Sequence, residues 1–352
     1  MSSNTNHPGI VMVFAPTKTF DLRPLNSRWD EFTDEAVDVA TIKSLSKQFD
    51  IGKCTEGKTK TVSIDMKAMN TKRLTQFLNI SESSATVALQ YWKDFNADIT
   101  ESSDDLDFKP ACYTFSGPAF EGLDPSTCDM ATLSFMGSQL YILDPVYGVL
   151  RCLQGMQPYR LDMATGLFIT KNGDKRQTLA AYWKQDVTLY LGRELMKNVN
   201  AAASVSNWGK TAGGGGGLHG PILANLASEE YTSSINPRLL PRNTIYLDIV
   251  FKHKGRVVAV HGKRARGLMA RYIAERHATT LQHISEFDLE GYECVPFDNG
   301  GVYECTRALG ENVRMVRMMF DRDEAPPKED IAATKRPAGG NKEQASKKKA
   351  KR

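Results

Sequence analysis

One segment near the middle of the chain, residues 146–163, combines anion-binding side chains with residues that fix a turn. It contains Arg151 and Arg160, whose guanidinium groups can donate paired hydrogen bonds to a phosphate or a carboxylate. It also contains Tyr147 and Tyr159, whose rings can stack on nucleic-acid bases. An apolar run typical of a strand precedes it, so we expect a ligand-binding loop at a strand end. The alternative is a turn whose arginines face the solvent.

Three further polar residues follow apolar runs that predict buried strands. Lys18 comes shortly after the run IVMVFA, and Asn225 and Ser228 come at the end of the run PILANLA. The carboxyl ends of parallel strands meet at one edge of a sheet, which is where α/β proteins bind ligands. We therefore expect these residues to lie near the arginines of the first segment. Ordinary surface turns are the alternative.

Positive charge is dense in residues 252–276, which hold eight Lys or Arg and one Glu, a net charge of +7. The second half of this stretch is typical of a helix. Basic residues at the beginning of a helix oppose its dipole, which costs stability unless an anion binds there. A solvated basic face is the alternative. The expected anion-binding residues are Lys263, Arg264, Arg266 and Arg271.

Residues 74–95 have the pattern of two helices joined by a tight turn at Asn79, Ile80 and Ser81. In a DNA-binding helix-hairpin-helix, the turn amides and the second helix N-terminus bind a phosphate. Such turns usually carry two glycines around an apolar residue, and here Asn79 and Ser81 take those places. An ordinary helical hairpin is therefore the alternative.

Two other patterns carry less weight. Residues 52–59, GKCTEGKT, fit the phosphate-loop pattern, but a polar helix rather than a strand precedes them. The six histidines have no metal-ligand spacing, and the six cysteines form no CxxC pair. We therefore predict no metal site and no cofactor; iron stays open but is unsupported by ligand spacing. Scattered cysteines predict reduced thiols in an intracellular compartment.

The composition is that of a soluble globular protein: 352 residues, 41% hydrophobic and 24% charged. No apolar run approaches the roughly 20 residues that cross a bilayer. The start, MSSNTNHPG, predicts no signal peptide. The net charge of +4 arises in residues 335–352, which alone carry +7, so the remaining chain is slightly acidic. Only local clusters could therefore bind nucleic acid.

We expect residues 1–325 to form one domain, with a disordered glycine-rich insertion at residues 201–220. Residues 326–352 are polar and Lys-rich, which predicts a disordered tail. Two basic clusters separated by ten residues have the form of a bipartite nuclear localisation signal, which predicts an import receptor as a partner and the nucleus, besides the cytoplasm, as location. A nonspecific nucleic-acid tail is the alternative. The signal residues are Lys335, Arg336, Lys347, Lys348, Lys349, Lys351 and Arg352.

Hydrophobic periodicity predicts the elements that position these residues. The expected helices are residues 33–49, capped by Thr33, the pair within 74–95, and 179–199. The expected strands are residues 10–15, 139–143, 221–227, 244–251, 256–261, 290–297, 301–305 and 313–320.

Several of these stretches, in this order, resemble the bacterial YaaA family of peroxide stress proteins. The matching segments are APTKTFD (15–21), YGVLR (147–151), MQPYRLDM (156–163), NLAS with EY (225–228, 230–231), ARGLMARYI (265–273) and EGY (290–292). The resemblance runs from about residue 10 to about residue 320. Cys152 stands where the family usually has Pro, Asp144 and Pro145 replace a Ser-Gly pair, and Ser116 replaces a Lys.

The resemblance implies an α/β (α+β) fold: a single compact domain with a mixed β-sheet wrapped by helices and a basic cleft. It also implies a helix-hairpin-helix at about residues 66–95, DNA binding, and a role in limiting iron-dependent oxidative damage to DNA during peroxide stress. The basic tail suggests a eukaryotic, nuclear version of this bacterial protein.

The first hypothesis is therefore a DNA-binding protein, monomeric and without membrane attachment, that recognises DNA structure or backbone rather than sequence. Its phosphate contacts would be Lys18, Arg151, Arg160, Lys263, Arg264, Arg266 and Arg271, with Tyr147 and Tyr159 stacking on bases. The second hypothesis is an enzyme acting on a phosphorylated small molecule or nucleotide in the same cleft. No nucleophile–base pair can be identified, so no reaction is named and an enzyme is the less expected outcome. A third, an ATPase, would need residues 52–59.

Overall fold

Five apolar segments form the parallel centre of a mixed sheet, in the order β12-β9-β8-β1-β4. β1, β4 and β8 are buried along their whole length, which is why they read as continuous apolar runs rather than as alternating ones. The bounds are β1 Ile10–Phe14, β4 Leu140–Asp144, β8 Ile222–Leu226, β9 Thr244–Phe251 and β12 Val313–Asp321. The mixed α/β fold expected from the sequence is confirmed.

Antiparallel strands complete this eight-stranded sheet at its two edges. β5 (Gly148–Arg151) pairs with β4, while β10 (Glu293–Cys294) and β11 (Glu304–Leu309) both pair with β12. Two small ribbons lie apart from the main sheet. They are β2 (Thr19–Phe20) with β3 (Phe115–Ser116), and β6 (Gly166–Leu167) with β7 (Gln177–Thr178).

The computed structural model describes residues 9–25, 37–48, 56–98, 108–167, 177–202, 220–298, 300–309 and 313–323. The helices in these ranges are α1 Val39–Lys47, α2 Glu56–Lys67, α3 Thr71–Leu78, α4 Glu82–Asp94, α5 Ala111–Thr114, α6 Pro118–Leu123, α7 Met130–Gln139, α8 Leu179–Ala202, α9 Glu229–Thr232, α10 Ala259–Arg276 and α11 Leu281–Ser285. Short 3₁₀ turns are η2 Pro125–Thr127, η3 Pro237–Leu239 and η4 Leu289–Gly291. None of the helices in these ranges is long and apolar enough to cross a membrane.

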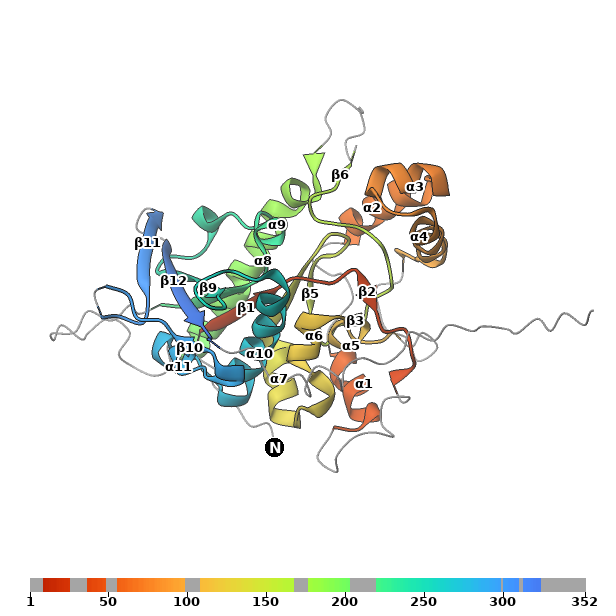
Figure 1. Ribbon diagram of the computed structural model, residues 1–352. Coiled ribbons are helices and arrows are strands. Elements are labelled where there is room, and N and C mark those ends of the chain that lie inside the picture. Colours follow the sequence, from red (N-terminus) through yellow and green to blue (C-terminus); the bar gives the residue numbers. More distant parts are fainter. Residues whose placement is uncertain are drawn as a thin grey trace, which may run out of the picture.

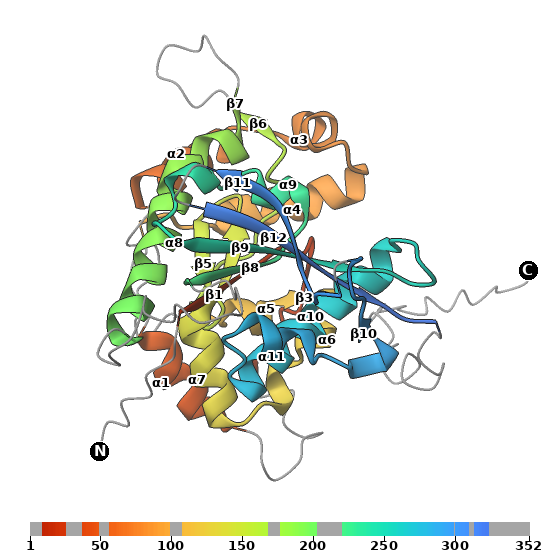
Figure 2. The same ribbon diagram turned by 90° about the vertical axis from the view of Figure 1, so that its left-hand side faces the viewer.

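The helices gather in groups around the sheet. α6, α7, α10 and α11 lie together on one side of the strands, and α2, α3 and α4 form a separate group at the other side (Figures 1 and 2). α8 packs against β1 and β5. The core that results includes the large buried side chains Trp92, Trp183 and Tyr141.

Two glycines allow α10 to lie very close to α6. A Cβ atom at Gly267 would lie 1.9 Å from the carbonyl oxygen of Ala119, and one at Gly122 would lie 2.3 Å from that of Arg264. No side chain fits at such distances, so glycine is required at both positions. The close contact fixes the position of α10 and therefore of the basic residues that it carries.

Three expected strands are wrong in part, and of residues 301–305 only Glu304 and Cys305 belong to a strand, β11. Residues 256–261 form no strand, because Lys254 and Gly255 adopt positive φ angles of 51° and 75°, which turn the chain after β9 so that α10 begins at Ala259. Only an isolated bridge joins His253 to Arg256. Of residues 290–297, only Glu293–Cys294 form a strand, because η4 occupies the beginning of that segment.

Other expectations fall at the limits of the described residues. α1 is capped by Asp38, whose Oδ1 accepts a hydrogen bond from the Thr41 amide at 2.9 Å, while the expected cap Thr33 lies outside the described residues. Residues 201 and 202 of the expected insertion are the last residues of α8. The rest of the insertion up to residue 219, and the tail with its localisation signal, also lie outside the described residues.

Candidate functional site

Polar residues meet at the carboxyl edge of the parallel strands. β1 lies between β4 and β8, and β8 lies beside β9, so the ends of these four strands are neighbours. Asp144 ends β4, Lys18 follows β1, and Asn225 near the end of β8 is directly opposite Asp248 of β9. The expectation that Lys18 and Asn225 lie at one sheet edge is met, because the strands are parallel.

Asp144 holds the loop formed by residues 156–163. Its carboxylate is fully buried, with Oδ1 accepting hydrogen bonds from the amides of Val146 at 2.8 Å and Tyr147 at 2.9 Å. Its Oδ2 accepts a hydrogen bond of 2.5 Å from the Tyr159 hydroxyl. The Tyr147 hydroxyl in turn accepts one of 3.0 Å from the Gln157 amide. Burial raises the pKa of Asp144 to about 6, and these hydrogen bonds limit the rise.

Tyr147 and Tyr159 position this loop and do not present their rings to a ligand. They are 2% and 3% exposed, and both hydroxyl groups are used in the network just described. The Tyr159 ring also contacts Phe20 and Trp92, with centroids 5.8 and 6.3 Å apart. We therefore leave both tyrosines out of any base-stacking role.

Lys18 and Arg160 lie together above β1. The Lys18 Nζ is 2.7 Å from Oδ2 of Asp162, and an Arg160 Nη1–H donates to the carbonyl oxygen of Lys18 at 2.8 Å. The Lys18 side chain is half exposed, so solvent weakens this ion pair. The two cations expected to share a site are therefore neighbours, but Asp162 already neutralises one of them.

Three of the expected anion-binding arginines have carboxylate partners within the protein. Arg151 lies 2.9 Å from Glu194 of α8, and its guanidinium group lies 5.0 Å from the centre of the Tyr141 ring. The other two ion pairs, at 2.6 Å each, are Arg264 with Glu290 and Arg271 with Glu275. Because these charges are neutralised locally, we assign the three arginines to the stability of the fold.

A cavity of about 500 Å³ opens where β8, β9 and β12 approach the beginning of α10. We call it the α10 pocket. Asp248 is central to it: Oδ1 accepts a hydrogen bond of 3.1 Å from Asn225, and Oδ2 lies 3.4 Å from Arg317. Its polar wall residues include Asn225, Asp248, Arg266 and Arg317, and the rest of its wall includes Gly262, Val257, Val258, Ala259, Ile249 and Met315.

The sequence identified Asn225 and Arg266 as binding residues, but not Asp248 and Arg317. A signal existed for both: Asp248 interrupts the apolar strand TIYLDIVF, and Arg317 alternates with apolar residues in β12. Ser228 is the N-cap residue of α9 and lies between two pocket residues, Ala227 and Glu229, without lining the pocket.

A basic loop follows β9 and borders the α10 pocket. It comprises residues 252–258, and two of its amides are held by the end of β12 and the residue after it: the Gly255 amide donates to Asp321 at 2.8 Å, and the Lys254 amide to the Arg322 carbonyl at 3.0 Å. Val257 of this loop is 67% exposed, as large apolar side chains seldom are. Within the described residues six cations of this loop and of α10 form no salt bridge: Lys252, Lys254, Arg256, Lys263, Arg266 and Arg276.

The hairpin of α3 and α4 has the expected shape. Asn79 adopts a left-handed conformation with φ 50°, which turns the chain, and the Ser81 side chain accepts a hydrogen bond from the Ser84 amide at 3.2 Å at the beginning of α4. Asn79 and Ser81 are exposed, and Ile80 is half-buried. That this hairpin is a DNA-binding helix-hairpin-helix stays a prediction.

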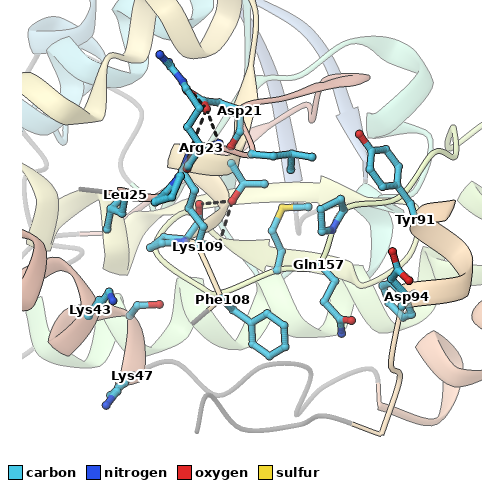
Figure 3. A pocket seen from close by; sticks show the side chains of 18 residues that line it. Asp21, Arg23, Leu25, Lys43, Lys47, Tyr91, Asp94, Phe108, Lys109 and Gln157 are labelled. Carbon is cyan, nitrogen blue, oxygen red and sulfur yellow. Dashed lines mark hydrogen bonds and ion pairs between the residues drawn. The ribbon is translucent and has the colours of Figure 1, made fainter. Parts of the chain in front are cut away.

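A second cavity, of about 710 Å³, lies beside α4 and α1 (Figure 3). Its charged residues largely bind one another: Asp21 accepts a hydrogen bond from Arg23 at 2.7 Å, and Lys109 donates to the Asp21 carbonyl oxygen at 2.7 Å. Gln157 joins this wall to the end of α4 through two hydrogen bonds of 2.8 Å with the backbone of Asn96. The network attaches the α3–α4 hairpin to the loop at the sheet edge.

The phosphate-loop pattern finds no support in the residues that are described. Gly57, Lys58 and Thr59 lie inside α2, and Lys58 donates to the Tyr182 carbonyl at 2.9 Å and pairs with Asp186. Residues 52–55 lie outside the described residues. Among the described side chains no group of His, Cys, Asp and Glu could hold a metal ion.

Comparison with known proteins places most of the chain in one family. The family model described as peroxide stress protein YaaA matches residues 10–297. The chain is 32% identical to UPF0246 protein RSc2009 of Ralstonia nicotianae, over 64% of this chain and 78% of the relative. It is 31% identical to a UPF0246 protein of Polynucleobacter necessarius, over 65% and 79%, and 32% identical to UPF0246 protein FP0718 of Flavobacterium psychrophilum, over 64% and 78%.

Proposed function

The chain belongs to the family of the peroxide stress protein YaaA, and on that basis we propose that it protects DNA during oxidative stress by binding the DNA backbone. Membership of the family assigns the chain to the response to peroxide. DNA binding, its surface and its consequence are the parts that we propose.

The observation that supports DNA binding most strongly is the group of unpaired cations at the basic loop and at Lys263. Within the described residues Lys252, Lys254, Arg256 and Lys263 have no salt-bridge partner, and all but the half-buried Lys252 are exposed. Like charges repel one another, so gathering them costs stability unless an anionic partner binds. A nucleic-acid backbone supplies phosphates along a line, which suits several cations on one loop.

The α3–α4 hairpin supplies a second contact in this proposal. Ser81 and the first residues of α4 are exposed, so the partly positive N-terminus of the helix can approach a phosphate. Glu82 in the first turn weakens this attraction. Contacts of this kind carry no sequence information, and we therefore propose binding to the backbone or to DNA shape.

Protection follows physically from the same contacts. Lys and Arg that neutralise phosphates release the cations condensed on DNA. Ferrous iron attracted to the backbone as a counterion would be displaced in this way, so iron-dependent damage near the bound site would fall. This route needs no iron site in the protein.

The C-terminal tail adds a second, independent proposal on location. Its two basic clusters would bind an import receptor and bring the protein to the nucleus, with a remaining cytoplasmic pool. The tail would also bind DNA weakly by charge alone. Binding must therefore be measured with the full chain and with a chain ending at residue 325.

The test is equilibrium binding of both chains to duplex and bulged DNA over a series of salt concentrations. We expect the chain without the tail to bind, with an affinity that falls steeply as salt rises, because phosphate contacts release counterions. Absence of binding without the tail, or an affinity independent of salt, would reject the basic surface as the DNA-binding site.

A further inference from the structure

The α10 pocket contains a buried positive donor without an acceptor. Among the described residues the Nε of Arg266 is buried and has no hydrogen-bond partner. Burial lowers the pKa of Arg266, while the nearby carboxylate of Asp248 opposes that effect. Buried guanidinium donors are almost always paired, so an unpaired one that lines a cavity indicates an anionic ligand. Arg317, a second guanidinium, lines the same cavity.

The pocket reaches the backbone of α10 one turn before Arg266. Gly262 is buried, yet a Cβ atom added there would meet no atom within 4 Å, so the space beside this glycine belongs to the cavity. Residues four apart lie on one face of a helix, which places Gly262 beside Arg266. The N-cap residue Val258 offers no side-chain acceptor to the first helical amides, and Val258 and Ala259 at this end of the helix line the pocket.

The other side of the pocket is suited to the rest of a larger ligand. Asp248 and Asn225 present oxygen and amide groups that can bind a sugar hydroxyl or a base amino group, and Val257, Ile249 and Met315 offer apolar surface for a ring. The volume of about 500 Å³ is larger than a phosphate ion requires, and it lies in the usual range for sites that bind small molecules. The Asp248 carboxylate would repel a phosphate, so the phosphate belongs on the Arg266 side.

We propose that the α10 pocket binds a phosphate monoester of a nucleoside, with the phosphate between Arg266 and Gly262 and the nucleoside against Asp248 and Asn225. Two sources carry this chemistry: a free mononucleotide and the 5′-phosphorylated end of a DNA strand. The assignment does not rest on the basic loop, since a free nucleotide would bind here even if duplex DNA bound nowhere.

The test is equilibrium binding by the full chain of 5′-AMP, 5′-UMP, adenosine and inorganic phosphate. We expect at least one of the two nucleotides to bind at least tenfold more tightly than adenosine. R266M should weaken nucleotide binding at least tenfold, while R276M, at the exposed far end of the same helix, should leave it unchanged. Failure of both nucleotides to bind at millimolar concentration, or equal binding by R266M and the unmodified protein, would overturn the proposal.

Two more variants separate ligand binding from folding. G262V extends a side chain into the cavity from a position where a Cβ atom meets no protein atom within 4 Å, so it should keep the thermal stability and lose nucleotide binding. D248N removes a negative charge, so it should bind inorganic phosphate more tightly while the preference for nucleotide over phosphate falls. Unchanged nucleotide affinity in stably folded G262V would overturn the proposed position of the ligand.

A comparison of oligonucleotides identifies the source of the phosphate. Single strands with a 5′-phosphate or a 5′-hydroxyl are bound to the unmodified protein and to G262V. If the unmodified protein binds the phosphorylated strand more tightly and G262V binds both strands equally, the pocket binds DNA ends. Equal binding of the two strands, together with tight binding of a mononucleotide, assigns it to a free nucleotide.

Discussion

The hydroxyl group of Tyr159 donates a hydrogen bond of 2.5 Å to the fully buried carboxylate of Asp144. This contact joins the end of β4 to the loop of residues 156–163, and together with the hydrogen bond between Gln157 and Tyr147 it holds that loop at the sheet edge. Because burial raises the pKa of this carboxyl group, the attachment of the loop is sensitive to pH.

Stability should therefore depend on pH through Asp144. Its pKa is about 6 in the folded protein against an ordinary value of 3.8, so the folded state keeps a proton that the unfolded state releases between these values. The stabilisation is fully present below the unfolded-state pKa and is lost as the pH rises through 6, by about 3 kcal/mol in total and by about 2 kcal/mol above pH 4.5. Urea unfolding of the protein and of D144N, at pH 4.5 and pH 7, measures the difference.

Asparagine is a suitable replacement because its oxygen can still accept the two backbone hydrogen bonds. The stability of the unmodified protein relative to D144N should fall between pH 4.5 and pH 7. A difference between the two proteins that stays constant with pH would show that Asp144 is not the group responsible.

Replacing each of two glycines of α10 with alanine should change the stability of the protein in opposite directions. G267A forces a Cβ atom against the Ala119 carbonyl oxygen at 1.9 Å, so α6 and α10 must separate at a cost of about 1–3 kcal/mol or more. G262A meets no atom and removes the conformational freedom of a helical glycine, which should stabilise the protein by about 0.5–1 kcal/mol. Thermal unfolding of both variants measures this contrast, and equal effects would contradict the described packing of α10.

Arg151 should matter for folding and not for DNA binding. R151M removes the buried ion-pair partner of Glu194, which is 9% exposed and keeps the more exposed Lys197 and the Tyr141 hydroxyl, so we expect a loss of about 2–4 kcal/mol. The folded fraction of R151M should bind DNA with an unchanged dependence on salt. If R151M has normal stability but binds DNA more weakly, Arg151 belongs to the DNA-binding surface.

The sequence predicted the sheet well where apolar runs are buried on both faces. β1, β4, β8 and β9 each lie within two residues of the expected strands, because a continuous apolar run has few other places in a fold. It failed at residues 256–261, whose alternating apolar and polar residues imitate a strand. There the left-handed turn at Lys254 and Gly255 and the packing of α10 on α6 decide the structure.

The candidate site shows what residue types alone cannot reveal. An arginine looks the same in a sequence whether or not a carboxylate from a distant element neutralises it. Glu194 lies 43 residues from Arg151 in the chain, and Glu290 lies 26 residues from Arg264. Such pairing is a property of the fold. Because these arginines are paired, we expect the basic loop, and not the arginines, to bind anions.

We propose that the basic loop binds the DNA backbone, and a pair of matched variants tests this proposal. K254A/R256A removes two charges from the loop after β9, and R238A/R242A removes two exposed charges before the same strand begins. The eight residues of β9 separate the two pairs by roughly 25 Å. Both variants have the same net charge, so a difference between them reports position and not overall attraction.

The measurement is the slope of the logarithm of the DNA-binding constant against the logarithm of salt concentration, for chains ending at residue 325. Each lost phosphate contact lowers the slope by about 0.9, so we predict that K254A/R256A reduces it by about 2 and weakens binding about tenfold at moderate salt. R238A/R242A should match the unmodified protein. Equal slopes and affinities for the two variants would contradict the account.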